Sequence, residues 1–427
     1  MSPSAISTTP PNGMDKTTDL AASAIEQKIA ETAPALSKIA SDSKLAPLDA
    51  SKLKFTRNTT PKTLPALDDP IRNTSSFCTD HMITAVWSAS TGWAAPELKP
   101  YGPFSIMPNA SVLHYATECF EGMKAYRGFD GALRLFRPDC NTRRMLTSAT
   151  RISLPAFEPS ELEKLIVNLM AIDGAKFLPE DQPGKFIYIR PTMIGTHAGL
   201  GVQIPSEAML YVIATYMPVL SEPTHGMKLL ASQNDMVRAW PGGFGYAKVG
   251  ANYGPSLIAQ QEAKSRGYDQ VLWLLGNEGS VTEAGASNFF VVWKSKEGKL
   301  QLVTAPLADK IILDGVTRRS VLQLVRERLS DNKTGLQPLE IVERKYTMTE
   351  VAEAYDDDRI VEAFACGTAF FVVGVSDIHH RGKDLKIPVV RGNAGEYATL
   401  IKSWLKNIMY GKEQHEWGYI VEPKETL

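Results

Sequence analysis

The chain has 427 residues, 44% of them hydrophobic and 22% charged, which is the composition of an ordinary globular protein. A chain of this length is too long for a single hydrophobic core, so we expect two domains of roughly 150 to 200 residues each. The formal net charge of -1 provides no global basic field for nucleic acid or an anionic membrane, so a small-molecule substrate is favoured. The four cysteines are far apart and form no C-x-x-C pair, which argues against a disulfide scaffold and a zinc site and fits a reducing compartment. No apolar run approaches the ~18 residues of a membrane span.

Residues 1–62 differ in composition from the rest and predict a flexible N-terminal extension without a packed core. Mitochondrial presequences are rich in arginine and poor in acidic residues. Here the first arginine is Arg57, and Asp15, Asp19, Glu26 and Glu31 precede it. We therefore expect a cytoplasmic protein, with mitochondrial import as the alternative because residues 21–40 have a weak amphipathic pattern.

A mixed pattern of helices and strands follows and predicts a small domain over 63–217. Ser160 and Glu163 have the spacing of a capping box at the start of a helix over 160–177. One apolar stripe runs along that helix through Leu162, Leu165, Ile166, Leu169 and Met170. Strands are predicted over 185–190 and 209–217. Residues 218–226, with two prolines and a glycine, predict the interdomain linker.

The second half repeats the mixture and predicts a large domain over 227–427. Helices are expected over 255–266 and, after Gly315, over 316–329. Buried strands are expected over 269–275 and 369–375. The runs 289–293 and 300–304 flank a Lys/Glu/Gly turn and predict a hairpin. The fold class expected from this alternation is α/β, or α+β.

Lys248 lies in WPGGFGYAKVGANYGP at 240–255, a stretch with five glycines. A P-loop requires serine or threonine after the lysine, whereas Val249 follows here, and a dinucleotide motif would need a third glycine where Lys248 stands. Burial favours the neutral amine of a lysine, which can attack an aldehyde and form a Schiff base. The stretch alone leaves open that Lys248 is an ordinary solvated charge.

Motifs in a fixed order extend from about Asp80 to Gly418. They are DHM at 80–82, HYATECFEGMKAYRG at 114–128, YIRPTMIG at 188–195, the stretch at 240–255, VTEAGASN at 281–288, DGVTRRS at 314–320 and GTA at 367–369. In this set the chain resembles the branched-chain amino-acid aminotransferases, and LAPLDASK at 45–52 is similar to fungal members. The resemblance implies a two-domain fold type IV enzyme, with a small α/β domain and a larger domain that has a mixed, barrel-like core.

The resemblance also implies pyridoxal 5'-phosphate as cofactor. Lys248 would form the Schiff base and, once released, would act as the proton shuttle. Glu283 would face the pyridine nitrogen, and Tyr253 would bind O3'. The alternatives are a salt-bridged surface glutamate and a core tyrosine. The phosphate would be held by Arg144, next to Arg143, by the backbone at Gly315, Val316 and Thr317, and by Thr368.

The implied reaction transfers the amino group of Leu, Ile or Val to 2-oxoglutarate in a ping-pong sequence. An apolar pocket wall and a site for the γ-carboxylate would then share one cavity. The wall would consist of Phe120, Tyr188, Leu200 and Val202, or the first two would be plain core residues. The polar part would consist of Arg190 and Tyr115, and the backbone amides of Thr368 and Ala369 would bind the α-carboxylate. In the family Tyr115, Leu200 and Val202 reach the neighbouring subunit's site, which implies a homodimer.

The sequence departs from the family pattern at several positions. Phe370 and Val373 stand where mammalian members have a C-x-x-C pair, so no thiol switch is expected there, although Cys366 is near. Ala286 replaces a threonine common in the family, and Gly374 replaces a proline. These changes leave room for an altered substrate preference.

Three rival interpretations remain. Another fold type IV enzyme, such as a D-amino-acid or amine transaminase or aminodeoxychorismate lyase, would share most cofactor residues but not Arg190 within YIRP. A non-catalytic carrier of the cofactor would keep Lys248 and Arg144 without needing Arg190. A nucleic-acid-binding protein would need a basic patch or module signature, and the sequence has neither.

Overall fold

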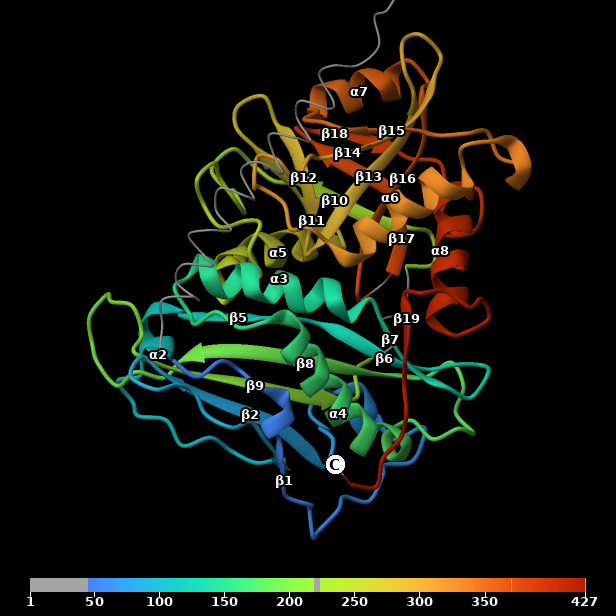
Figure 1. The fold of residues 1–427 in the computed structure, drawn as a ribbon. Helices are drawn as coiled ribbons and strands as arrows, with labels where there is room; N and C mark the ends of the chain where they lie inside the picture. The colour runs from blue at the N-terminus through green and yellow to red at the C-terminus, as the bar shows by residue number, and fades with distance from the viewer. Residues whose placement is uncertain (1–44, 219–222, 370, 427) are drawn as a thin grey trace, which may run out of the picture. The chain divides into compact units, whose positions relative to one another are not determined.

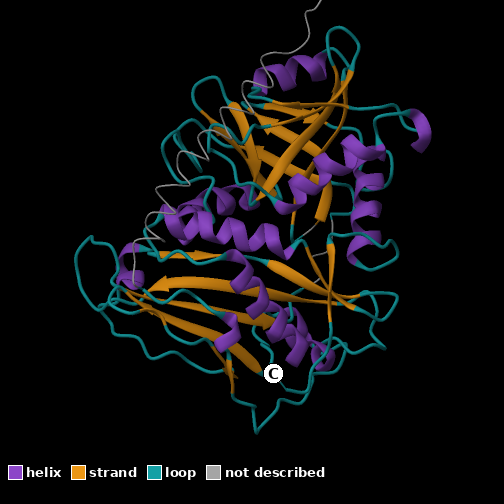
Figure 2. Cartoon of the chain, viewed as in Figure 1, coloured by secondary structure: helices purple, strands orange, loops and turns teal. Residues whose placement is uncertain are grey.

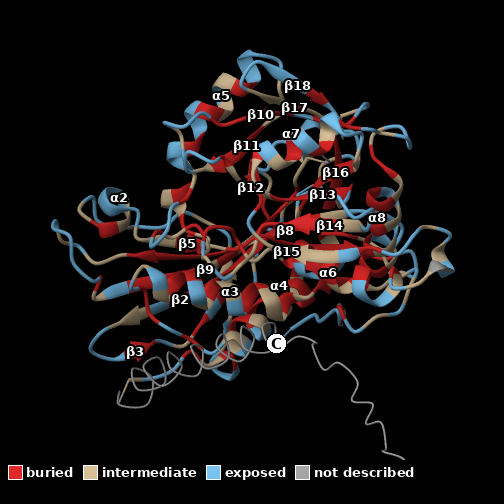
Figure 3. Ribbon diagram, turned by 90° about the horizontal axis from the view of Figure 1, so that it is seen from above, coloured by how far each residue is buried: buried red, intermediate tan, exposed pale blue. Residues whose placement is uncertain are grey.

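The computed structural model describes residues 45–218, 223–369 and 371–426, and Leu45–Leu427 cluster as one compact unit. Two β-sheets organise this unit, one formed mainly by the first half of the chain and the other by the second half (Figures 1 and 2). Most strand residues are buried, whereas exposed residues concentrate in loops and on the outer faces of helices (Figure 3). Each sheet has its own hydrophobic core.

The first sheet has ten strands in the order β1-β4-β2-β9-β8-β6-β7-β19, with β3 on β2 and β5 on β8. Its strands are β1 (Lys54–Phe55), β2 (His81–Ser88), β3 (Gly92–Trp93), β4 (Glu97–Pro100), β5 (Glu118–Phe120), β6 (Met123–Arg127), β7 (Leu133–Phe136), β8 (Phe186–Gly195), β9 (Glu207–Thr215) and β19 (Gly418–Val421). The helices of this part are α2 (Ser111–Tyr115), α3 (Pro138–Arg151) and α4 (Pro159–Phe177), with 3-10 turns η1 (Ala50–Lys52) and η2 (Pro70–Asn73).

Helix α4 confirms the predicted stripe, because all five of its apolar residues are buried in the core of the first sheet. The predicted capping box is wrong. Helix α4 begins at Pro159 with Glu158 as the N-cap, and no side chain caps it. Proline is favoured at the first helical position because it lacks the N–H that would otherwise need a partner. Ser160 therefore lies inside the first turn.

The second sheet has nine strands and contains a closed barrel. Its strands are β10 (Met227–Ala231), β11 (Gln270–Leu275), β12 (Ser280–Ala284), β13 (Ser287–Lys294), β14 (Leu300–Thr304), β15 (Glu340–Glu343), β16 (Ile360–Gly367), β17 (Phe371–His380) and β18 (Lys383–Lys386). Because β12 pairs with both β11 and β13, the strands β12, β11, β10, β17, β16 and β13 close into a six-strand ring. This confirms the mixed fold with a barrel-like core.

Helices and 3-10 turns fill the connections of the second sheet. They are η3 (Gly250–Asn252), η4 (Gly254–Ser256), α5 (Leu257–Ser265), α6 (Val316–Arg328), η5 (Asn332–Thr334), α7 (Met348–Asp356) and α8 (Glu396–Met409). The predicted hairpin is confirmed, since β13 and β14 pair in antiparallel register. The helices expected over 255–266 and 316–329 and the strand over 269–275 are also found, with ends shifted by one or two residues.

Both ends of the described chain join the first sheet. Leu48 and Ala50 lie in its core, and Lys54 and Phe55 pair with β4. The expectation of a flexible segment up to residue 62 is therefore wrong from residue 45 onward. The physical reason is that the edge of β4 offers unpaired backbone groups, which a short parallel strand satisfies. Residues 1–44, including the pattern at 21–40, lie outside the described residues.

At the other end, β19 pairs with β7 although the sequence places it in the predicted large domain. The boundary at 217 and 227 stays a prediction, and residues 219–222 of the predicted linker lie outside the described ranges.

Candidate active site

Lys248 lies where the second half of the chain contacts the first sheet. Its carbonyl oxygen accepts from the Phe120 amide at 3.1 Å, and its own amide donates to Ser148 Oγ at 2.8 Å. Glycine permits this close approach, because a Cβ at Gly250 would stand 1.8 Å from Glu118 Oε1. The Lys248 backbone is thereby fixed on both sides, by β5 and by α3.

The Lys248 amine faces an aromatic pair. Nζ donates to the Tyr253 hydroxyl at 2.9 Å and lies 4.7 Å from the centroid of the Phe120 ring. The Phe120 and Tyr253 rings themselves are 5.1 Å apart. The amine is thus held by one hydroxyl and one ring face, and is half-buried.

Glu283, on β12, is a buried carboxyl with three partners. Oε1 accepts from Asn288 Nδ2 at 3.2 Å and from the Leu313 amide at 3.3 Å, and Oε2 lies 2.6 Å from Arg238 Nη1. Burial raises the pKa of Glu283, and the positive charges of Arg238 and Lys248 oppose that rise. A carboxylate in this setting is suited to stabilise a positive charge placed beside it.

Arg144, on α3, points inward and is held by a second buried carboxylate. Its Nε and Nη2 donate to the two oxygens of Glu121 at 2.7 and 2.8 Å, and Nη1 donates to the Asp314 carbonyl at 2.9 Å. Burial acts to lower the pKa of Arg144, but Glu121 raises it above its usual value. Arg143 is exposed and pairs with Asp139, so Arg144 is the arginine directed into the site.

The N-terminus of α6 adjoins Arg144 through the Asp314 carbonyl. Gly315 is its N-cap, and no side chain caps the first turn formed by Val316 and Thr317. A Cβ at Gly315 would stand 2.1 Å from Asn288 Oδ1, so the close packing requires glycine. A helix N-terminus with free amides next to an arginine is an arrangement that binds anions. Thr317 and Thr368 line one small cavity of about 20 Å³ beside it.

Arg190, on β8, extends the cluster toward Phe120. Its guanidinium lies 4.6 Å from the Phe120 ring centroid and 5.1 Å from that of Tyr188, and Nη2 donates to the Tyr188 hydroxyl at 3.1 Å. Its Nε is buried without a hydrogen-bond partner among the described residues. An arginine on an aromatic floor with a spare donor can bind a carboxylate.

Three predicted residues lie apart from this cluster in the single chain. Leu200 and Val202 are 67% and 92% exposed, on the loop between β8 and β9. Tyr115 is also exposed, and its hydroxyl accepts from the Gly201 amide at 2.7 Å. Tyr115 therefore adjoins the loop that carries Leu200 and Val202. Ala369 is exposed as well, and its carbonyl accepts from Lys124 Nζ at 3.0 Å.

Three residues of the site were missed by the sequence reasoning. Glu121 directly follows the predicted residue Phe120 in FEGMKAY, and its position inside that motif was the available signal. Asn288 ends the VTEAGASN motif and binds both Glu283 and the Leu313 carbonyl. Arg238 lies ten residues before Lys248, and no spacing rule connects it with Glu283.

One of the departures from the family pattern, the glycine at 374, has a structural explanation. A Cβ at Gly374 would stand 2.5 Å from Ala394 Cα, so the close packing of residues 393–394 accounts for the glycine. Cys366 is buried, and burial raises the pKa of its thiol. Val373 is buried in β17, whereas Phe370 lies outside the described residues. Ala286 is exposed, and nothing in the structure explains its choice.

Metal sites and membrane spans are both absent from the described residues. No three His, Cys, Asp or Glu side chains in the described ranges group in a way that would hold a metal ion. No helix of the described chain is long and apolar enough to cross a membrane.

Comparison with known proteins places this geometry in a family. The family model for amino-transferase class IV matches residues 118–378. A cytosolic branched-chain-amino-acid aminotransferase of Saccharomyces cerevisiae is 46% identical over 88% of this chain and 98% of its own length. A mitochondrial one of Schizosaccharomyces pombe is 45% identical over 86% of this chain and 84% of its own.

Solved structures agree with the fold. A branched-chain aminotransferase of Thermoproteus uzoniensis with norvaline aligns with a TM-score of 0.61 at 24% identity, over 79% of this chain and 99% of its own. One of Thermobaculum terrenum in its PLP-form aligns with a TM-score of 0.59 at 22% identity, over 79% and 98%. The chain therefore belongs to the class IV aminotransferases of fold type IV and, within them, to the branched-chain amino-acid aminotransferase family.

Proposed function

We propose that this enzyme transfers the amino group of leucine, isoleucine or valine to 2-oxoglutarate by a ping-pong mechanism, yielding branched-chain 2-oxo acids and L-glutamate. The observation that carries the proposal is the Lys248 amine, hydrogen-bonded to Tyr253 and grouped with Glu283 and Arg144. The names of relatives more than 40% identical over most of the chain support the substrate class.

The donor set suits pyridoxal 5'-phosphate. Arg144, the amides at the uncapped start of α6 and Thr368 would hold the phosphate, since an anion there would meet both a guanidinium and the helix dipole. Glu283 would bind the pyridine nitrogen, Tyr253 would bind O3', and Lys248 would bind the aldehyde carbon. When bound, the cofactor supplies an electron sink for the bond broken at the substrate's α-carbon.

The residues around this group then have separate tasks. Besides binding the cofactor, Lys248 Nζ would take the α-proton of the amino acid and hold it for later return, which requires a neutral amine within hydrogen-bond reach. The Tyr253 hydroxyl at 2.9 Å positions that amine. Glu283, kept dry by burial, would stabilise a protonated pyridine nitrogen, and a protonated ring withdraws electrons more strongly.

Two kinds of substrate side chain would share one wall. Phe120 and Tyr188 provide apolar area for a branched side chain, at about 0.8 kcal/mol for each buried CH₂. Arg190, which lies against the same two rings with a spare buried donor, would bind the γ-carboxylate of glutamate. The amides of Thr368 and Ala369 would bind the α-carboxylate that both substrates share.

We propose a homodimer as the smallest complete catalyst. Leu200 and Val202 are exposed apolar residues on one loop, and Tyr115 adjoins them through Gly201. Such a surface is costly on a lone soluble chain and would be covered in a dimer. There it would complete the partner's pocket wall. A stable monomer with full specific activity would contradict this proposal.

We propose the cytoplasm as the location, because acidic residues precede the first arginine of residues 1–62. Relatives of similar identity carry cytosolic and mitochondrial names, so tagging the full chain and imaging it against a mitochondrial marker is the direct test.

The central test follows the cofactor's absorbance during reaction. Its band should bleach when leucine is added and return with 2-oxoglutarate, and Lys248→Ala should abolish the cycle. Lys264→Ala, which removes an exposed lysine on α5, is the matched control and should behave as the parent. Arg190→Gln should raise KM for 2-oxoglutarate at least tenfold and that for leucine less. Turnover of D-alanine without turnover of leucine would refute the substrate assignment.

A further inference from the structure

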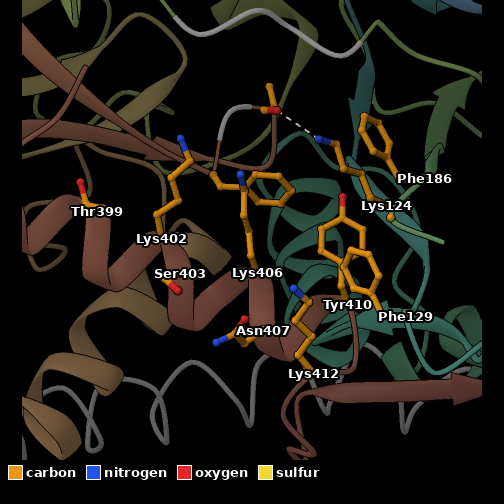
Figure 4. Close-up of a pocket in the computed structure, with 13 residues that line it drawn as sticks. Lys124, Phe129, Phe186, Thr399, Lys402, Ser403, Lys406, Asn407, Tyr410 and Lys412 are labelled. Atoms are coloured by element: carbon orange, nitrogen blue, oxygen red, sulfur yellow. Dashed lines mark hydrogen bonds between the residues drawn. The ribbon is translucent and has the colours of Figure 1, made fainter. Parts of the chain in front are cut away.

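A second cavity of about 540 Å³ adjoins the proposed active site, and Ala369 is the one residue of the mechanism above among those that line it. It is lined by β6 and β8 of the first sheet, by Ala369 and Phe371 at the start of β17, and by one face of α8 (Figure 4). Its volume is within the range of small-molecule pockets, roughly 300 to 1,000 Å³.

The lining of this cavity is strongly positive. Four lysines contribute to it, and no carboxylate is present among the described residues that line it. The lysines are Lys124, Lys402, Lys406 and Lys412. The whole chain has a net charge of only -1, so this concentration is local. A cavity lined by charges of one sign attracts small ions of the other sign.

Helix α8 presents two parallel rows of residues to the cavity. Lys402 and Lys406 are one turn apart, and the polar residues Thr399, Ser403 and Asn407 form the adjacent row at the same spacing. Like charges at this spacing repel each other, and an anion between them would reduce that repulsion. In Figure 4 both amines extend from α8 toward the side on which Lys124 meets Ala369.

Lys124 connects this cavity with the active site. Only 3% of the residue is exposed, and its amine lies 3.9 Å from the Phe186 ring centroid and 4.7 Å from that of Phe371. Burial lowers the pKa of Lys124 to about 8. No carboxylate of the described residues forms an ion pair with it, and the Ala369 carbonyl accepts one of its three N–H groups. A buried ammonium of this kind gains from an anion that supplies further acceptors.

The position of Lys124 also gives the cavity a route to the substrate. It lines the small cavity shared by Thr317 and Thr368, and it is the cross-strand partner of Tyr188. Its hydrogen bond holds the turn at Ala369, whose amide is proposed to bind the α-carboxylate. A change in the Lys124 amine therefore acts directly on the turn that selects the substrate.

We propose that this lysine-lined cavity binds a small organic or inorganic anion with two or more negative charges, of the phosphorylated or polycarboxylate class, and that its occupancy alters substrate affinity through the Lys124–Ala369 contact. Binding itself is independent of the proposed reaction, whereas the effect on substrate affinity rests on the proposed function. Phe129, more than half exposed, and Tyr410 give the cavity an aromatic rim as well.

The test uses the holoenzyme, in which the cofactor fills the phosphate site at α6. Calorimetric titration with pyrophosphate and, separately, with citrate measures binding and shows whether the cavity prefers a phosphorylated anion or a polycarboxylate. Saturable binding of either probe is expected, and Lys402→Gln with Lys406→Gln should weaken it about tenfold. Lys99→Gln with Lys164→Gln, which removes the same charge from exposed ion pairs elsewhere, should leave it unchanged. The absence of saturable binding, or equal weakening in both double variants, would overturn the site.

Two further measurements separate this site from the proposed active site. Arg190→Gln should leave the Kd for citrate unchanged, and a tenfold loss there would assign the binding to the substrate pocket instead. In the parent enzyme a bound probe should change KM for leucine more than kcat, and Lys124→Met should remove that change while the folded cofactor spectrum persists. If leucine is not turned over, the calorimetry still decides whether the cavity binds the anion.

Discussion

The buried pair of Glu121 and Arg144 offers a sharp test of how the site is held together. Glu121 is fully buried and accepts four hydrogen bonds, two from Arg144, one from Asn141 Nδ2 at 2.8 Å and one from the Gly122 amide at 3.2 Å. Glu121→Gln preserves the shape but places an amide group against donors. At least one charge-assisted bond is lost, and the Arg144 charge stays buried with a neutral partner.

The expected cost follows from these contacts. Hydrogen bonds to charged groups contribute about 1.5 to 3 kcal/mol each, and removing one member of a buried ion pair costs about 3 to 5 kcal/mol. Because glutamine retains one acceptor, we expect the lower end, about 3 kcal/mol. With an m value of about 3 kcal/mol/M, the urea midpoint of the apo-protein should fall by about 1 M.

The matched control is Glu97→Gln, which removes a carboxylate from an exposed pair with Lys99 at 3.0 Å. Exposed pairs contribute about 0 to 1 kcal/mol, so its midpoint should hardly move. Far-UV circular dichroism follows both unfolding transitions. If the two variants lose the same stability, Glu121 does not hold Arg144 as described. Cofactor affinity provides a second measurement, because Arg144 would lose its orientation, and each 1.4 kcal/mol lost there weakens binding about tenfold.

Three other predictions address features away from that pair. Cys366 is buried and the pKa of its thiol is raised, so iodoacetamide should label the partly exposed Cys140 first and reach Cys366 only in urea. Mass spectrometry of the labelled peptides measures this order. For the same reason mild peroxide should not cause an inhibition that a dithiol reverses. Burial raises the pKa of Glu362 from 4.5 to about 7 in the folded chain, so the folded state binds this proton more tightly and the stability it contributes is lost as pH rises through about 7. Relative to the parent, the free energy of unfolding of Glu362→Gln should therefore rise by up to about 3 kcal/mol between about pH 4.5 and pH 8. Urea unfolding at several pH values measures this difference, and a difference that does not change with pH would contradict the reasoning. Thr347 caps α7, because its hydroxyl accepts from the Glu350 amide while the Glu350 carboxylate accepts from the Thr347 amide. Thr347→Ala should therefore lower the free energy of unfolding by about 1 kcal/mol in a thermal unfolding experiment. The control Thr399→Ala, which loses only a bond to the Gly395 carbonyl, should lower it less.

Local patterns in the sequence predicted the elements whose cause is local. The α4 stripe, the β13–β14 hairpin and the α6 start after Gly315 follow from periodicity and turn residues within a few positions. Barrel closure does not, because it requires β12 to pair with β11 and β13 at once. The short strand at Lys54–Phe55 was missed for the same reason, since only the distant edge of β4 makes it a strand.

The candidate site shows the same division between local and distant causes. Lys248, Glu283, Arg144 and Arg190 were predicted from motifs in family order, and the structure places the four side chains near one another. The residues that hold them in place, Glu121 and Arg238, were not predicted. In the sequence each is a charged residue of the kind that is usually exposed to solvent, and only the fold buries each beside an opposite charge. The lysine-lined cavity likewise depends on α8 meeting β6, a contact between residues that are far apart in the chain.

The pairing of β19 with β7 has a consequence for how the chain is made. During synthesis β7 emerges early, whereas Gly418–Val421 emerges only after the whole barrel has been translated. Until then the edge of β7 exposes unpaired backbone groups, which favours intermolecular strand pairing. The nascent first sheet therefore passes through a long interval of vulnerability to aggregation. Chaperone demand should depend on the final segment of the chain, and truncation before Gly418 should yield insoluble protein even though every proposed catalytic residue is intact.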